Sequence, residues 1–147
     1  MTAHSSAAGA TLVKTEARGP SLRVWGLLVL VFFVLTSAVG GSLALESSYL
    51  VVTLTSHIGL ALVTLGLAGY GAAFISRFYK AAPRAGAGLS ALSALGATIS
   101  GAVFLLGGQS NAALYSMEGF AGLGIVGALL MAVLGGLAGR VRSDLPT

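Results

Sequence analysis

The run VWGLLVLVFFVLTSAVGGSLAL occupies residues 24–45 and contains no charged side chain. At about 1.5 Å of rise per residue, a helix of this length crosses the hydrocarbon core of a bilayer, which is about 30 Å thick. Three further apolar stretches follow, over residues 50–76, 86–108 and 112–139, and no proline interrupts any of the four. The sequence therefore predicts an all-α protein, a bundle of four transmembrane helices.

The composition agrees with this interpretation. Of the 147 residues, 56% are hydrophobic and only 8% are charged, whereas about a quarter of the residues of a soluble domain are charged. The mean hydropathy is +0.94, so we expect an integral membrane protein whose first partner is the lipid bilayer. The absence of cysteine excludes disulfides and thiolate metal sites.

The basic residues predict the orientation. All eight lie before the first apolar stretch, between the second and third, or after the fourth: Lys14, Arg18, Arg23, Arg77, Lys80, Arg84, Arg140 and Arg142. Basic residues concentrate on the cytoplasmic side, so both termini are expected to be cytoplasmic in a multi-pass protein of the cell membrane. These charges lie in short loops rather than on one patch, so we expect no nucleic-acid partner.

The expected organisation is a flexible cytoplasmic tail over residues 1–22, a membrane domain over 23–140 and a second tail over 141–147. Short polar connections make consecutive helices antiparallel neighbours. Small residues at a spacing of four predict close helix contacts; they are Ser93, Ala97 and Gly101 in the third helix and Gly124, Ala128, Ala132 and Gly136 in the fourth.

A displacement of 61 residues superposes the first two helices on the last two. It pairs Gly40 with Gly101 and His57 with Glu118. Because both halves begin on the same side, the sequence is compatible with a parallel two-helix internal repeat.

Two titratable residues lie well inside the apolar stretches, His57 in the second helix and Glu118 in the fourth. Each is roughly 10 Å from the outer start of its helix. Ionisable residues at such depth are costly and face the interior of a bundle. Either the two form a hydrogen-bonded structural pair, or they belong to a haem, metal, proton or quinone site. Met117 adds a candidate thioether ligand.

Two runs and one histidine resemble one half of a haem A synthase, a family built of two four-helix halves. The runs are Ala38–Leu43, with its glycine pair, and Ser100–Ala112 at the junction of the third and fourth helices, while His57 stands at the position of the family's second-helix histidine. The resemblance covers about residues 27–134. It implies a compact single-half form that binds haem b through His57, with Met117 or another copy of the chain as the second ligand.

Three positions differ from the family's active half. Leu54 and Ile58 stand where that half has a glutamate and an arginine, and Glu118 aligns with its fourth-helix histidine. If the chain is an enzyme, the resemblance implies a haem-modifying oxidoreductase, but these differences favour cofactor binding without catalysis.

We therefore expect a haem-binding or haem-handling membrane protein that serves the biogenesis or electron transfer of a respiratory oxidase. Its cofactor-binding candidates are His57, Met117 and Glu118, and its partners would be a second copy or a respiratory membrane complex. The alternative is a non-catalytic accessory subunit or assembly factor in which His57 and Glu118 form a structural pair. A transporter with Glu118 as proton site is disfavoured, because the inner halves of the helices show little polarity.

Overall fold

Four α-helices make up the fold. The computed structural model describes residues 21–45, 51–79, 81–107 and 110–143. The helices are α1 (Leu22–Leu45), α2 (Val51–Phe78), α3 (Ala81–Leu106) and α4 (Asn111–Ser143). Each contains a stretch long and apolar enough to cross a membrane. The prediction of an all-α bundle of four membrane-spanning helices is therefore confirmed.

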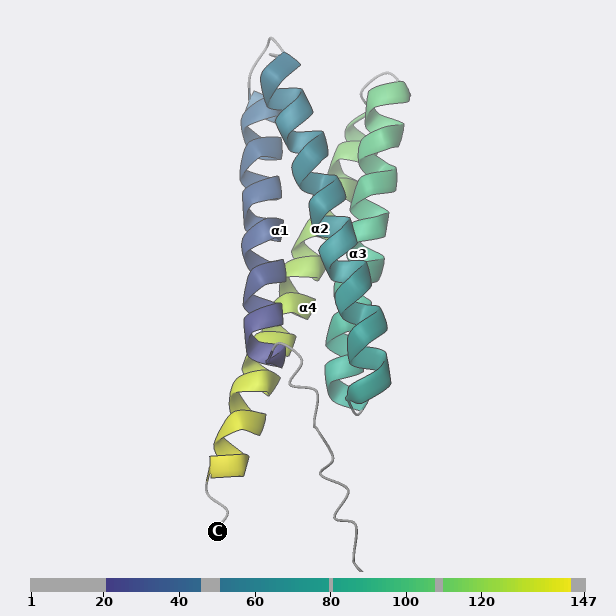
Figure 1. Ribbon diagram of the computed structural model, residues 1–147. Helices are drawn as coiled ribbons and strands as arrows, with labels where there is room; N and C mark the ends of the chain where they lie inside the picture. Colours follow the sequence, from purple (N-terminus) through teal and green to yellow (C-terminus); the bar gives the residue numbers. More distant parts are fainter. Residues whose placement is uncertain (1–20, 46–50, 80, 108–109, 144–147) are drawn as a thin grey trace, which may run out of the picture.

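The expected tails lie largely outside the described residues, which omit 1–20 and 144–147. The expected connection over residues 46–49 also lies outside them. The first residue of α1 and the last turns of α4 lie at the same end of the bundle (Figure 1). Their cytoplasmic placement stays a prediction.

Serine side chains mark the start of two helices. The backbone N–H of Val24 donates a hydrogen bond to Ser21 Oγ at 3.3 Å. At the start of α4, the N–H of Ala113 donates to Ser110 Oγ, also at 3.3 Å. The first N–H groups of a helix have no partner within the helix, and a serine oxygen before the first turn supplies one.

The boundaries of α3 and α4 differ from those expected. α3 begins at Ala81 rather than at Gly86, and α4 continues to Ser143. α2 also continues to Phe78, so most of the connection expected between the second and third apolar stretches is helical. Pro83 does not prevent this, because it lies in the first turn of α3, where the missing proline N–H has no helical partner to lose.

The helices form a ring in which each packs against two neighbours, in the order α1, α2, α3, α4 and back to α1. At one end, the hairpin end, which contains Leu45, Val51, Leu106 and Asn111, α1 lies beside α2 and α3 beside α4 (Figure 1). Toward the opposite, terminal end, α2 leans onto α3 and α4 crosses onto α1 (Figure 1). The two hairpins therefore separate from each other at the hairpin end.

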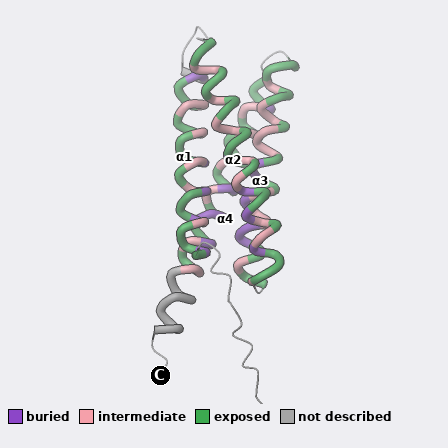
Figure 2. The backbone as a smooth tube through the Cα atoms, in the orientation of Figure 1, coloured by how far each residue is buried: buried purple, intermediate pink, exposed green. Residues whose placement is uncertain are grey.

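The buried core lies in the terminal half and the middle of the bundle (Figure 2). Its members are Leu22, Val29, Phe33, Ala68, Ile75, Ala87, Ala94, Ala128 and Met131. Toward the hairpin end, the buried apolar side chains among the described residues are Leu43 and Ala113. The bundle is thus tightly packed at one end only.

Small residues bring α4 against both of its neighbours. A Cβ at Gly26 of α1 would lie 2.5 Å from the backbone nitrogen of Ala132 and 3.0 Å from the carbonyl oxygen of Ala128. On the other side of α4, a Cβ at Gly127 would lie 2.6 Å from Ser90 Oγ. Of the small-residue stripe predicted for the fourth helix, Ala128 and Ala132 therefore do mark a close helix contact.

The outer surface of the bundle is apolar. Large exposed side chains occur on all four helices, among them Val31, Leu62, Tyr70, Leu92, Ile99, Val126 and Val133. A soluble protein does not expose apolar surface on this scale. In a bilayer these side chains face the lipid, as the hydropathy of the four helices predicts.

Candidate functional site

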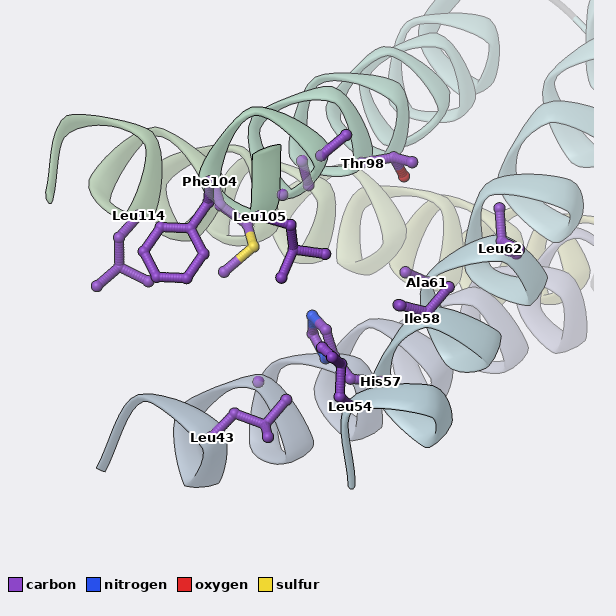
Figure 3. Close-up of a pocket in the computed structure, with 15 residues that line it drawn as sticks. Leu43, Leu54, His57, Ile58, Ala61, Leu62, Thr98, Phe104, Leu105 and Leu114 are labelled. Carbon is purple, nitrogen blue, oxygen red and sulfur yellow. The ribbon is translucent and has the colours of Figure 1, made fainter. Parts of the chain in front are cut away.

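A cavity lies where the two hairpins separate. It consists of two adjoining lobes of about 200 Å³ and about 300 Å³. Residues from all four helices line both lobes: Gly40, His57, Ala61, Ala97, Thr98, Leu114 and Met117. We call the two lobes together the hairpin cavity. Figure 3 shows the smaller lobe, with Leu43 and His57 on one side and Phe104, Leu105 and Leu114 on the other.

The two lobes lie toward opposite faces of the bundle. The smaller lobe extends between α2 and α3, where Ile58, Leu62 and Leu105 line it. The larger extends between α1 and α4, where Ser37 and Glu118 line it. The cavity is therefore a slot between the two hairpins, with His57 in the wall of both lobes.

Part of the small-residue stripe on α3 lines this slot instead of a helix contact. Ser93 is buried, as expected for a packing position. Ala97 and Gly101 are only half-buried and line the cavity. Gly101 nevertheless lies against a side chain of α4, because a Cβ there would be 3.4 Å from Met117 Sδ. Ala97 instead lines the cavity between the two hairpins.

His57 reaches from α2 into the cavity (Figure 3). Its ring lies against Gly40 of α1, where an added Cβ would be 2.7 Å from His57 Cε1. Contacts below 3.0 Å are essentially never made by a real Cβ. A glycine at position 40 is therefore what gives the imidazole room.

The hydrogen bond of His57 determines its tautomer. The ring Nδ1 lies 3.1 Å from the backbone carbonyl oxygen of Thr36. A carbonyl oxygen only accepts hydrogen bonds, so Nδ1 carries the hydrogen and donates it. In the neutral ring, Nε2 then holds a lone pair. Metal-bound histidines are commonly oriented in this way, through the N–H of the ring nitrogen that does not bind the metal.

Two threonines form hydrogen bonds between α1 and α2 beside His57. The hydroxyls of Thr36 and Thr64 lie 2.9 Å apart and join α1 to α2. Each hydroxyl has one hydrogen, so one of them donates across to the other helix while the other donates to a carbonyl of its own helix. The own-helix carbonyls are those of Phe32 for Thr36 and Leu60 for Thr64, both at 2.7 Å. Hydroxyls satisfied in this way within the membrane hold the two helices in one register beside His57.

Met117 occupies on the second hairpin a place like that of His57 on the first. It lines both lobes, and its Sδ would lie 3.4 Å from a Cβ at Gly101. Gly101 is the residue that the expected internal repeat pairs with Gly40. His57 lies against Gly40, and the side chain that lies against the equivalent glycine of the second hairpin is Met117. It is not Glu118, although the repeat pairs Glu118 with His57.

Glu118 lines the larger lobe but is exposed. Among the described residues, its carboxylate forms no hydrogen bond or ion pair with His57, whose ring is bonded to Thr36 instead. The predicted His57–Glu118 pair is therefore not formed. The two residues lie on α2 and α4, which face each other diagonally across the ring.

The three candidate residues thus line one cavity. In the described helices, no group of three or more His, Cys, Asp or Glu side chains could hold a metal ion. A bare ion would need several protein ligands. A cofactor that brings most of its own metal ligands needs only one or two from the protein.

Comparisons with protein-family models, curated proteins and solved structures gave no match to this chain. The resemblance to haem A synthases therefore stays a hypothesis based on the residues quoted above. What the structure establishes is a four-helix membrane bundle with an apolar cavity that contains one anchored histidine.

Proposed function

We propose that this membrane protein binds haem b in the hairpin cavity, with Nε2 of His57 as the ligand to iron. The observation that carries the proposal is the hydrogen bond from His57 Nδ1–H to the Thr36 carbonyl. It orients the ring and leaves the lone pair of Nε2 free to bind iron. Haem proteins commonly use a histidine as axial ligand, and second-shell hydrogen bonding helps to tune such a site.

The surroundings of His57 suit this cofactor. The cavity is lined mostly by aliphatic side chains and small residues, which suits an apolar macrocycle. Haem supplies four nitrogen ligands to its iron, so one or two protein donors complete the coordination. Met117, which lines both lobes, is the candidate for the second donor within the chain. Bound iron would supply one-electron chemistry, in keeping with a role in the biogenesis or electron transfer of a respiratory oxidase.

We favour cofactor binding over haem oxidation. Leu54 and Ile58, at the positions of the family's glutamate and arginine, line the smaller lobe with apolar surface. Glu118 is the one carboxylate among the residues that line the described cavity, and it is exposed. These side chains offer no pair of acid and base groups beside His57.

Absorption spectroscopy of the protein purified in mild detergent tests the proposal. Titration with haemin should produce a Soret band with one equivalent bound, and His57→Ala should lose it. Added imidazole should restore part of the band in His57→Ala, because it replaces the missing Nε2 donor. A wild-type protein without the band, or a His57→Ala protein with an unchanged band, would contradict the proposal.

A second function is favoured by a different observation. His57, Thr36 and Thr64 together tie α1 to α2 by hydrogen bonds, and such a polar contact works without any cofactor. The chain would then be a non-catalytic accessory subunit or assembly factor of a larger membrane complex. This function predicts a colourless protein that co-purifies with larger membrane subunits, and isolation without partners would count against it.

A further inference from the structure

The hairpin cavity reaches the lipid-facing surface along two seams. The α1–α4 seam, formed by Ser37, Gly41 and Gly122, consists of exposed residues that line the larger lobe. The α2–α3 seam, formed by Ile58, Leu62 and Leu105, consists of exposed residues that line the smaller lobe. A slot of this kind is open sideways toward the bilayer.

The two seams differ in the size of their side chains. A Cβ added at Gly41 or at Gly122 would have nothing within 4 Å. The α2–α3 seam instead carries branched aliphatic side chains that partly cover the smaller lobe. The α1–α4 seam therefore has the smaller side chains, and it leads to the larger lobe.

The route along the bundle axis from the terminal end is closed. The larger lobe ends on Phe33, Thr64 and Ala94, each of which is only 3% exposed. Below them lies the packed core of the bundle (Figure 2). A ligand the size of a cofactor cannot pass between such close-packed side chains without opening the core.

We propose that a flat, lipid-soluble ligand reaches His57 sideways from the bilayer through the α1–α4 seam. The flat shape follows from the slot between the two hairpins, and the lipid solubility follows from the apolar lining and the lipid-facing opening. The identification of this ligand as haem rests on the proposed function. The route itself depends only on the open space at Gly41 and Gly122.

Because the chain contains no cysteine, a single introduced thiol reports on this route. Ala97→Cys places the thiol in the wall shared by both lobes. The protein is reconstituted into lipid vesicles and treated with N-phenylmaleimide, a flat lipid-soluble reagent, and labelling is followed by mass spectrometry. Adding Gly122→Phe should slow the labelling about tenfold or more, which is within the usual range for association rates of variants.

Two matched variants make the test specific. Ala102→Phe fills the α2–α3 side, because Ala102 lines the smaller lobe and is exposed. Gly119→Phe adds the same ring to α4 at an exposed position outside the cavity lining, with nothing within 4 Å of its Cβ. Both should label within about twofold of the parent. Should Gly122→Phe not fold, Gly41→Phe narrows the same seam from α1.

The proposal is overturned if Gly122→Phe and Gly41→Phe label at the parent rate, or if Ala102→Phe causes the slowing instead. Circular dichroism and gel filtration of each variant establish that it is folded. A separate haemin titration of the wild-type protein tests the ligand. Absence of a Soret band with the expected labelling pattern would refute haem as the ligand and leave the route standing. A Soret band with equal labelling rates would refute the route alone.

Discussion

The Nδ1–H of His57 on α2 donates a hydrogen bond to the carbonyl oxygen of Thr36 on α1, across 3.1 Å. This bond orients the imidazole within the hairpin cavity and fixes which ring nitrogen holds the lone pair. The bond also joins the two helices of the first hairpin at the level where the hairpins separate. His57 is therefore both a structural contact and a candidate ligand, and experiments that separate the orientation of the ring from the binding of iron distinguish the two roles.

Gly40→Ala should displace the imidazole without removing it. The new methyl would lie 2.7 Å from His57 Cε1. The imidazole must therefore move away from residue 40 and lose its hydrogen bond to the Thr36 carbonyl. We expect haem affinity to fall by about ten- to one-hundredfold, the usual cost of losing the orientation of a metal ligand. Haemin titration followed at the Soret band measures the change.

Gly41→Ala is the matched control for this variant. It makes the same chemical change at the next residue, where a Cβ would have nothing within 4 Å. The haem affinity of Gly41→Ala should equal that of the wild-type protein. Equal affinities of Gly40→Ala and the wild type would show that the ring orientation seen here does not govern binding.

Met117 and Glu118 are adjacent in the sequence but should behave differently. Met117→Leu removes the sulfur that lines both lobes and keeps an apolar side chain of similar size. We expect the haem to stay bound through His57 but to change its spin state, visible in the absorption spectrum. Glu118→Gln should leave the spectrum unchanged, because its exposed carboxylate forms no hydrogen bond with His57. The reverse result would make Glu118 the second ligand.

The architecture could be predicted from the sequence because the bilayer sets the length of an apolar helix. Uncharged runs such as residues 24–45 can satisfy their backbone hydrogen bonds in lipid only as helices. The helix start at Ala81 differs from the predicted start at residue 86 for a local reason. A proline usually indicates a loop, but Pro83 falls within the first turn of α3, where it is tolerated.

The site could be predicted only in part. His57, Met117 and Glu118 stand out by type, and all three line the cavity. Which of them interact could not be predicted, because α2 and α4 are diagonal in the ring. The partner of His57 is a backbone carbonyl, which every residue possesses, so no side chain in the sequence identifies it. The glycine pair at positions 40 and 41 is the one local feature of the sequence that indicates where the imidazole ring lies.

Thr64→Val should weaken the contact between α1 and α2. Thr64 is 3% exposed and its hydroxyl lies 2.9 Å from that of Thr36. Valine keeps the shape and removes the interhelical hydrogen bond, which in membrane proteins contributes about 0.6 kcal/mol on average and up to about 1.7 kcal/mol. Unfolding in mixed detergent micelles measures the loss. Thr55→Val should cost less, because the exposed Thr55 hydroxyl donates to the Val51 carbonyl of its own helix and, among the described residues, bonds to no other helix.

Gly127→Ala should destabilise the contact between α3 and α4. Its methyl would lie 2.6 Å from Ser90 Oγ and 2.8 Å from the carbonyl oxygen of Gly86. The hydroxyl can rotate away, but the backbone carbonyl cannot, so the two helices must move apart. Overpacking of this kind costs about 1 to 3 kcal/mol, measured by the same unfolding assay.

At Gly119, on the exposed side of the same helix, a Cβ would meet nothing within 4 Å. Gly119→Ala should therefore raise the stability of α4 by about 0.5 to 1 kcal/mol, because alanine loses less backbone entropy in a helix than glycine does. Equal stabilities of the two variants would mean that α3 and α4 do not approach each other as closely as the contact between Ser90 and Gly127 implies.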